Sequence, residues 1–234
     1  QRIQRRARER YRAMAVSDLD SFLFTGNQVY IAQLYERYLD DPGSVDPKWQ
    51  DFFADLEDDA GRLGATLDRF SALLQQGGSI LDLGCGSGDP IARYLESLGH
   101  AVTGIDAAHA MIDLARRKFP AGDWRQGDMR DLDLGQTFDG VIGWDSFFHL
   151  TPDEQRATLV RIASHLGPIG AMMLTVGPQA GEPIGRVGDD PIYHSSLSPS
   201  EYESILAGLG LDILQFAKED PGCDYHTVLL AQKR

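Results

Sequence analysis

Residues 79–90 read SILDLGCGSGDP, and the rest of the chain is organised around them. A short apolar run is followed by an acid and three alternating glycines, and Asp89 and Pro90 would then be the N-cap and first residue of a helix. Glycine is needed where the backbone takes positive φ or approaches a ligand, and a helix N-terminus offers unpaired N–H groups. The stretch predicts a strand, a tight turn and a helix start that bind something small.

The spacing of these glycines narrows the choice of ligand. The dinucleotide fingerprint has its third glycine three residues after the second, and here that position is Asp89, which repels a pyrophosphate. A second apolar run, at residues 101–105, stops at Asp106, about 20 residues past the glycines, where a ribose-binding acid is expected. Two consecutive strand–helix units therefore end in acids.

Three motifs, taken in order, resemble the cofactor motifs of class I S-adenosylmethionine-dependent methyltransferases. They are Asp82 to Gly88, Asp106, and Gly127-Asp128-Met129. The resemblance covers residues 61–234. It implies a Rossmann-like α/β fold with a seven-stranded, mostly parallel sheet, a C-terminal antiparallel hairpin and preceding N-terminal helices. It also implies S-adenosyl-L-methionine as cofactor and methyl transfer to a small-molecule acceptor.

The same resemblance implies roles for individual residues. Asp82 would orient the turn and the cofactor amino group, and Asp106 would accept both ribose hydroxyls. Each acid also has a structural interpretation, since Asp82 can cap the turn, Asp106 can cap the next helix and Asp128 can be a surface acid. The cofactor-binding set implied by the motifs is Asp82, Gly84, Gly86, Asp106, Asp128 and Met129.

The fourth predicted strand ends in residues 144–150, where this fold places groups that face the substrate. Methyl transfer removes a positive charge from sulfur, so it needs alignment, exclusion of water and, for a protonated nucleophile, a base. Aromatic faces tolerate a sulfonium, and Trp144 is expected on the cofactor side and Phe148 on the substrate side. Asp145 and His149 are the candidate proton acceptors. The alternatives are a core role for Phe148 and a hydrogen bond to the following helix for His149.

A long polar loop spans residues 177–198, and loops of this length are usually functional lids or disordered. Tyr193 and His194 are its candidate substrate-binding residues, with plain packing as the alternative. His226, which opens the last predicted strand, is expected to face the same pocket. No metal site is expected, because no pair of histidines has a spacing suited to ligation.

The segment from Ser21 to about Asp58 resembles the N-terminus of the E1 component of 2-oxoglutarate dehydrogenase. In that family the segment is associated with docking onto the acyltransferase core, whereas small methyltransferases commonly place an N-terminal helix over the cofactor. Both a docking arm and a lid therefore stay open. The matching residues are Ser21-Phe22-Leu23-Phe24, Gly26-Asn27, Leu34-Tyr35-Glu36, Tyr38-Leu39, Asp41-Pro42-Gly43-Ser44-Val45-Asp46-Pro47 and Trp49.

Composition limits the classes of function. The 234 residues are 42% hydrophobic with a net charge of −13, so they can form a core, and nucleic acid is an unfavourable partner. Residues 1–20 are expected to be a basic tail, either solvated or a transit peptide, before a helical segment at 21–60 and a methyltransferase domain at 61–234. With two cysteines and no apolar run long enough for a membrane span, a cytoplasmic protein is expected.

Alternating strand and helix patterns predict the order of the elements. Strands are expected near residues 79–83, 101–105, 123–126, 138–143, 169–176, 211–218 and 225–232, with helices between the first five. Two other functions remain for test. One is a docking or regulatory protein of a 2-oxoacid dehydrogenase complex acting through residues 21–58, and the other is a nicotinamide-dependent oxidoreductase, which the acid at position 89 disfavours.

Overall fold

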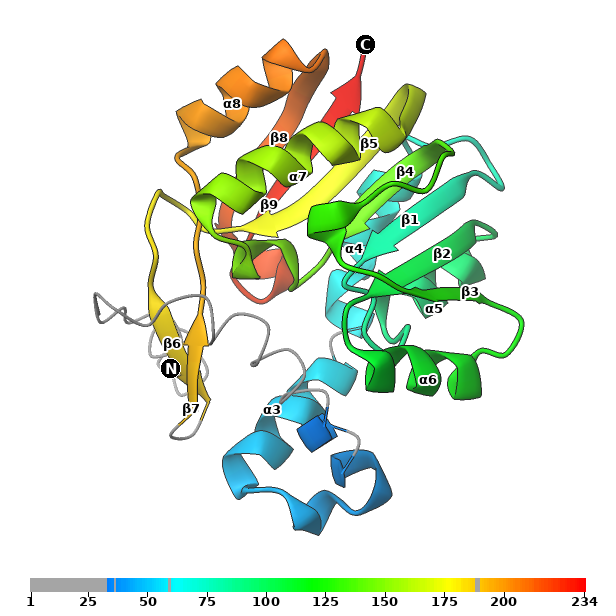
Figure 1. Ribbon diagram of the computed structural model, residues 1–234, viewed down its shortest axis with the longest axis vertical. Coiled ribbons are helices and arrows are strands. Elements are labelled where there is room, and N and C mark those ends of the chain that lie inside the picture. Colours follow the sequence, from blue (N-terminus) through cyan, green and yellow to red (C-terminus); the bar gives the residue numbers. More distant parts are fainter. Residues whose placement is uncertain (1–32, 36, 59, 188–189) are drawn as a thin grey trace.

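The computed structural model describes residues 33–187 and 190–234, apart from Glu36 and Asp59. These residues form a seven-stranded sheet with helices on both faces and a separate two-stranded sheet (Figure 1). Within these ranges every helix falls short of the length and apolarity needed to cross a bilayer. The basic tail predicted at residues 1–20 lies outside the described residues.

The large sheet has the strand order β3-β2-β1-β4-β5-β9-β8. Neighbours from β3 to β5 pair in parallel, and β9 pairs antiparallel with both β5 and β8, which confirms the predicted mixed sheet and terminal hairpin. The strands are β1 (Ser79–Leu83), β2 (Ala101–Asp106), β3 (Asp123–Gln126), β4 (Phe138–Gly143), β5 (Leu166–Val176), β8 (Leu211–Asp220) and β9 (His226–Lys233).

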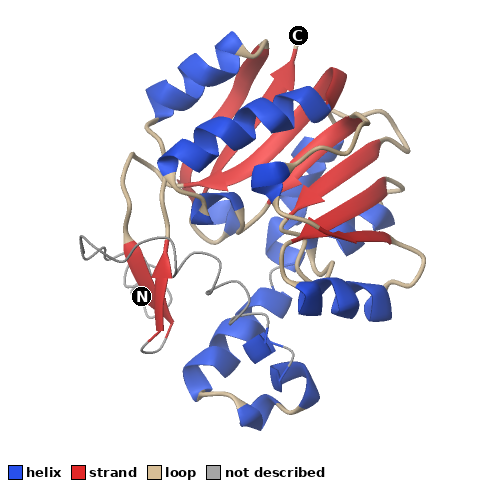
Figure 2. Ribbon diagram, viewed as in Figure 1, coloured by secondary structure: helices blue, strands red, loops and turns tan. Residues whose placement is uncertain are grey.

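Helices cover both faces because the central strands are apolar on both sides (Figure 2). In β1, Leu81 and Leu83 join one core cluster while Ile80 joins the other, as the alternation of a strand requires. The first cluster packs under α7 and α8, and the second under α4, α5 and α6. The helices are α4 (Ala60–Ser71), α5 (Ile91–Ser97), α6 (His109–Lys118), α7 (Pro152–His165) and α8 (Pro199–Gly208).

Three local expectations were wrong. No α-helix joins β3 to β4 in this described stretch, where a short 3-10 helix η2 (Met129–Asp131) leads into a turn at Gly135. The α5 helix begins at Ile91 with Pro90 as its N-cap, and the Asp89 carboxylate pairs with Arg93 and Lys118. The β5 strand also begins three residues earlier than expected, directly after α7.

The loop at residues 177–198 contains structure that its polar sequence did not predict. It forms an antiparallel hairpin of β6 (Ile184–Val187) and β7 (Asp190–Tyr193), which lies beyond the carboxyl ends of the large sheet's parallel strands (Figure 1). Its return arm is anchored, because Ser195 N–H donates to the Phe148 carbonyl at 2.7 Å. Buried Gln155 also donates to the Ser195 carbonyl at 3.0 Å.

The N-terminal segment also lies beyond these strand ends, beside α6 and the hairpin (Figure 1). Residues 37–40 are helical, a 3-10 helix η1 (Pro42–Ser44) follows, and α3 (Pro47–Asp58) lies within the helical segment predicted at residues 21–60. Buried side chains of this segment pack against α6 and β7. We call the following set the N-terminal cluster: Leu34, Tyr35, Val45, Trp49, Phe53, Leu114 and Ile192.

Candidate functional site

The glycine turn follows β1 at the carboxyl edge of the sheet, where open α/β sheets bind their ligands. Gly84, Gly86 and Gly88 have φ values of +73°, +54° and +82°, in the region that favours glycine. A Cβ on Gly84 would lie 2.3 Å from the Cβ of Ser146, so a side chain cannot be placed there without displacing its neighbour. Gly84 is therefore required for the packing of this turn against the turn after β4, and the approach of a ligand to Gly84 and Gly86 stays a prediction.

Asp106 ends β2 and ties the glycine turn to the next strand–helix connection. Its Oδ2 accepts a hydrogen bond from Gly86 N–H at 3.0 Å, and its Oδ1 accepts one from Ala108 N–H at 2.8 Å. Burial raises the pKa of this carboxyl, while the two N–H donors act in the opposite direction. Because carboxylate oxygens have further lone pairs, ligand hydroxyls can still bind here.

Asp82 lies beneath the glycine turn and is 1% exposed. Burial raises its pKa to about 7, and the neighbouring charge of Asp106 adds to this effect. Its Oδ2 is buried without a hydrogen-bond partner among the described residues. A buried carboxylate oxygen without a partner is costly, so this site is suited to a ligand that brings a positive charge or a donor.

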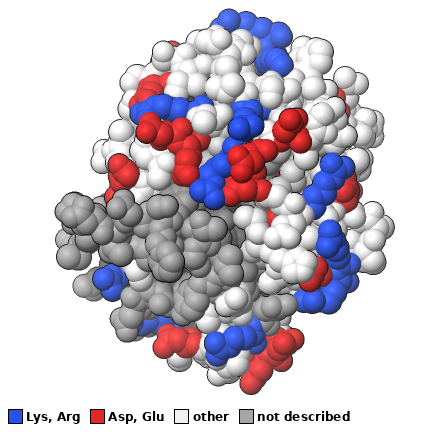
Figure 3. Space-filling model, viewed as in Figure 1, with Lys and Arg blue, Asp and Glu red and all other residues white. Residues whose placement is uncertain are grey.

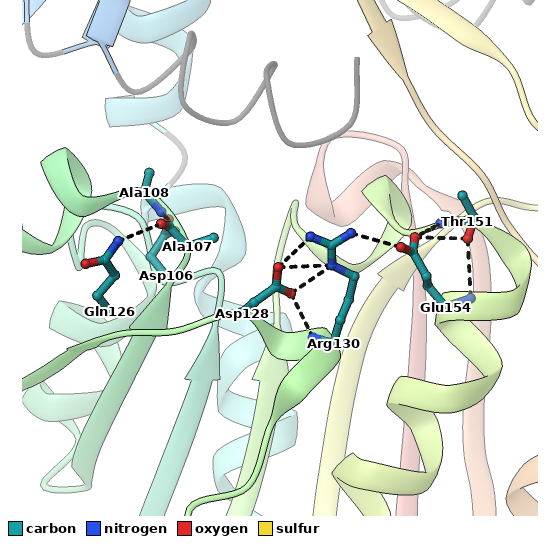
Figure 4. A network of polar contacts seen from close by, with 8 residues as sticks. All are labelled: Asp106, Ala107, Ala108, Gln126, Asp128, Arg130, Thr151 and Glu154. Atoms are coloured by element: carbon teal, nitrogen blue, oxygen red, sulfur yellow. Dashed lines mark hydrogen bonds and ion pairs between the residues drawn. The ribbon is translucent and has the colours of Figure 1, made fainter. Parts of the chain in front are cut away.

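Asp128 joins a polar network that crosses the sheet edge to α7 (Figure 4). Both carboxylate oxygens accept from the Arg130 guanidinium, which also donates to Glu154 at 2.9 Å. Burial acts to raise the pKa of Asp128, but the Arg130 hydrogen bonds outweigh it and the pKa is lowered. Asp128 also caps η2, so its predicted contact with an adenine edge would be added to an existing structural role.

Met129 is buried beside the glycine turn, where its Cε lies 3.5 Å from the position of a Cβ built on Gly84. Gln126 is close to Asp106 at the same edge, and its Nε2 donates to the Ala107 carbonyl at 3.3 Å (Figure 4). The ends of β1, β2 and β3 thus bring the cofactor-binding residues predicted from the motifs to one edge of the sheet.

Trp144, Asp145 and His226 meet where β4 and β9 lie on either side of β5. Nε2 of His226 lies 2.8 Å from Oδ1 of Asp145, and the Trp144 and His226 rings are 5.1 Å apart. Trp144 is buried, and its indole Nε1 has no hydrogen-bond partner among the described residues. The structure therefore places His226 in direct contact with the candidate base Asp145.

Phe148, His149 and His194 form a second group, with ring centroids 4.7 to 5.1 Å apart. Nδ1 of His149 lies 3.0 Å from the Tyr193 carbonyl, which fixes the ring against the end of β7. Burial lowers the pKa of His149, against the Tyr193 hydrogen bond and the charge of Asp145, which both raise it. A neutral His149 leaves Nε2 as a lone-pair acceptor.

Tyr193 itself turns to the hairpin, where its hydroxyl donates to Glu182 at 2.6 Å. The loop thus brings His194 and the Tyr193 carbonyl to Phe148 and His149, while the Tyr193 hydroxyl is engaged within the loop, and substrate binding by Tyr193 and His194 stays a prediction.

Two residues that support the site were missed by the sequence analysis. Ser146 donates to the Leu83 carbonyl at 2.6 Å and holds the turn after β4 against the one after β1. Thr175 accepts from Asp145 N–H at 2.8 Å. Neither hydroxyl lies in a motif, and each acts through a contact more than 25 positions away, so the sequence alone carried no signal for them. Among the described residues, no group of three or more possible ligands could hold a metal ion.

Comparison with known proteins divides the chain into two parts. Residues 80–170 match the family described as methyltransferase domain, and residues 20–60 match the family described as 2-oxoglutarate dehydrogenase N-terminus. The second match recurs among curated proteins. The 2-oxoglutarate dehydrogenase E1 components of Brucella ovis and Brucella canis are 59% identical over 49 residues, which is 21% of this chain and 5% of theirs. The chain thus spans about a twentieth of the length of these relatives.

Solved structures share the fold of the larger part. An S-adenosylmethionine-bound amino pentose methyltransferase of calicheamicin biosynthesis from Micromonospora echinaspora has a TM-score of 0.60 and 22% identity, over 76% of this chain and 92% of that one. Magnesium protoporphyrin IX methyltransferase from Synechocystis has a TM-score of 0.60 and 18% identity, over 94% and 100%. A glycopeptide N-methyltransferase has a TM-score of 0.61 and 16% identity, over 74% and 90%.

Proposed function

We propose that this chain, whose residues 80–170 are a methyltransferase domain in a class I methyltransferase fold, transfers a methyl group from S-adenosyl-L-methionine to a small-molecule acceptor. The observation that carries the proposal is the buried carboxylate of Asp82, with an oxygen lacking a partner beneath a glycine turn. The ammonium group of an amino acid would donate a charge-assisted hydrogen bond to this oxygen.

The residues at the ends of β1 to β3 fit the cofactor. Asp82 would hold its amino group, the backbone of Gly84 and Gly86 would approach its methionine part, and Asp106 would accept its ribose hydroxyls. Asp128 and the backbone of Met129 would border the adenine. When bound, the cofactor supplies a methyl group on a positively charged sulfur, and the face of Trp144 suits that charge.

A small-molecule acceptor fits the region beyond β4 and β7. Phe148 and His194 would offer ring faces to it, and His226 and Tyr193 would line the approach from β9 and the hairpin. Asp145 and His149 are the groups that can take a proton there. The net charge of −13 disfavours nucleic acid, and acidic and basic side chains are interspersed on the face in Figure 3. The three methyltransferases that share this fold are named for an amino pentose, a glycopeptide and magnesium protoporphyrin IX.

The domain boundaries belong to the same proposal, with a methyltransferase domain at residues 61–234 and a lid formed by residues 21–60. The N-terminal cluster supports the lid, because Tyr35 packs on Phe53 and its ring lies 5.9 Å from Lys118 Nζ on α6. We place the protein in a reducing, cytoplasmic compartment, since Cys85 and Cys223 are buried free thiols.

Thermal unfolding with S-adenosylhomocysteine tests this function. The melting temperature of the wild-type chain should rise with ligand concentration, because a ligand that binds only the folded state stabilises it. Asp106→Ala should remove most of this shift, whereas Asp133→Ala, at an exposed position, should keep it. Transfer of labelled methyl from S-adenosylmethionine to amino sugars, peptides and porphyrins would then identify the acceptor. A wild-type chain without any shift at millimolar ligand would rule the proposal out.

A second candidate function is docking onto the acyltransferase core of a 2-oxoacid dehydrogenase complex. The observation in its favour is the 59% identity over 49 residues with 2-oxoglutarate dehydrogenase E1 components, a match that covers 21% of this chain. Packing within this chain explains only part of the match to the E1 components, because several residues of the matching segment are exposed. These are Asp41, Pro42, Gly43, Asp46 and Pro47. The resemblance places these residues among the matching ones, and exposed residues shared by two different proteins are what a common partner would require.

Sedimentation with a purified succinyltransferase core tests docking directly. The full chain should co-sediment with the core, and excess E1 component should displace it, since both would use the same segment. A chain that stays in solution, or one that E1 does not displace, would leave the lid as the segment's role.

A further inference from the structure

We propose that the indole N–H of Trp144 binds the carboxylate of the cofactor's amino acid part, next to the place where Asp82 binds its ammonium group. The inference rests on the proposed function and deepens it, because it assigns a role to the edge of the Trp144 ring as well as to its face. It starts from two buried polar atoms, one a donor and the other an acceptor.

Trp144 is 7% exposed, and its Nε1 is buried without a hydrogen-bond partner in the part of the chain that the structure describes. An indole N–H can only donate, so this atom needs an acceptor. The buried indole of Trp124 shows the usual arrangement, since its Nε1 donates to the Phe119 carbonyl at 2.9 Å. A buried donor that the fold leaves without an acceptor is costly, and Trp144 is therefore suited to a ligand that brings one.

The donor of Trp144 and the acceptor of Asp82 belong to the same face of two adjacent strands. Asp82 pairs in register with Ile142 across β1 and β4. Trp144 comes two residues after Ile142, and both join the core cluster that contains Ile80. Ile80 is two residues before Asp82, and side chains two positions apart on a strand point to the same face. One ligand group at this edge of the sheet can therefore meet both atoms.

The order of the strands indicates which part of the cofactor lies there. The sheet order β3-β2-β1-β4 places Asp128, Asp106, Asp82 and Trp144 in succession along the carboxyl edge. In the proposed function Asp128 borders the adenine and Asp106 accepts the ribose hydroxyls. The amino acid part then lies at the other end, at Asp82 and Trp144.

An amino acid carries a donor and an acceptor on one carbon, as these two residues require. Its ammonium group donates to the Asp82 oxygen that has no partner, and its carboxylate accepts from the Trp144 N–H. The two charges of the amino acid cancel, so the acids nearby do not repel the group as they would repel a lone anion. A ligand without the carboxylate would leave the Trp144 donor buried and unpaired.

The edge and the face of the Trp144 ring serve different groups of the same ligand. The N–H lies in the ring plane and carries partial positive charge, whereas the face is electron-rich and suits the sulfonium. Trp144→Phe keeps an aromatic face and removes only the donor together with the larger ring. This substitution therefore separates carboxylate binding from contact with the sulfur.

Nitrogen-15 NMR of the three tryptophan indole groups in the full chain tests the contact without any methyl acceptor. Trp49→Phe and Trp124→Phe each remove one signal, which identifies the signal of Trp144. Saturating S-adenosylhomocysteine should move the Trp144 N–H proton downfield, because it gains a charged acceptor. The Trp124 signal should move little, since its N–H already donates within the chain. Methylthioadenosine, which lacks the amino acid part, should leave Trp144 in place, and an equal shift with both ligands would overturn the inference.

Calorimetry with decarboxylated S-adenosylhomocysteine, which keeps the ammonium group, measures what the carboxylate contributes. The wild type should bind S-adenosylhomocysteine about 10-fold or more tightly than the decarboxylated ligand, as expected for a hydrogen bond to a charged group. Trp144→Phe should lose most of this preference. Trp124→Phe, which removes an indole whose donor is already paired, is the matched control and should keep it.

The same titrations separate the two possible failures. A wild-type chain that does not bind S-adenosylhomocysteine refutes the proposed function. A wild type that binds it, but whose preference for the carboxylate is absent or is unchanged in Trp144→Phe, refutes only the role of the Trp144 N–H.

Discussion

Replacing Asp82 by Asn should change how the stability of the free protein depends on pH. In the folded state the pKa of Asp82 is raised to about 7 by burial and by Asp106, from an ordinary value of 3.8. Below about pH 4 the carboxyl is protonated in both the folded and unfolded chains. Between the two pKa values only the folded chain keeps the proton, so the free energy of unfolding falls as pH rises.

The size of this effect follows from the pKa difference. A shift from 3.8 to about 7 corresponds to about 4 kcal/mol of stability lost between about pH 4 and pH 7. Asp82→Asn lacks the titrating group, so its free energy of unfolding should fall less over the same range. Urea unfolding at about pH 4.5 and pH 8 measures this difference. Asp133→Asn, at an exposed position, is the control and should follow the wild type.

Ligand binding should reverse the protonation of Asp82. An ammonium group placed against the oxygen that has no partner stabilises the carboxylate, so binding expels the proton. At pH 6 a group with a pKa of about 7 is roughly 90% protonated, and S-adenosylhomocysteine should release nearly one proton from this site. Calorimetry in two buffers of different ionisation enthalpy measures this release. Equal heats in both buffers at pH 6 would refute the reasoning.

Three further substitutions test the packing around the site. Gly84→Ala, whose Cβ would lie 2.3 Å from Ser146, should lower the free energy of unfolding in urea by about 3 kcal/mol or more. Gly86→Ala has no atom within 4 Å of its Cβ and should lower it only by the roughly 1 kcal/mol of a positive φ. Equal losses for the two variants would contradict the clash at Gly84. Gln155→Leu should cost about 2–4 kcal/mol, because buried Gln155 accepts from the Tyr202 hydroxyl and donates to Ser195, and an unchanged melting temperature would argue against that network. Phe53→Ala should open a cavity in the N-terminal cluster and cost about 3–5 kcal/mol of local stability. Backbone amide hydrogen exchange should therefore speed up in residues 37–58 but not in β1 or β4. Unchanged exchange in residues 37–58 would show that the cluster does not hold the segment.

The N-terminal segment shows how one sequence feature can have two explanations. Its aromatic residues Trp49 and Phe53 are buried in the N-terminal cluster. Asp41 caps η1 through Gly43 N–H, so part of the matched run builds a local turn. The exposed remainder of the run is what the docking experiment examines.

The sequence by itself determined the seven strands of the large sheet along the chain, the antiparallel terminal hairpin and the glycine turn. These features depend on local causes, namely the alternation of apolar residues, the capping box at Thr151 and the positive φ that glycine permits. It also placed Asp82, Asp106 and Asp128 at strand ends. Asp82 and Asp106 lie at the ends of apolar runs, and Asp128 lies in a motif.

Only the tertiary structure decided which side chains meet. His226 and Asp145 are 81 positions apart and come together because β9 inserts beside β5, which no local pattern encodes. The Arg130 bridge from Asp128 to Glu154 and the hairpin of β6 and β7 were likewise absent from the sequence reading. The packing of segments that are distant in the sequence decides which side chains are buried and which pair. Burial and pairing in turn set the protonation states of the titratable groups in the site.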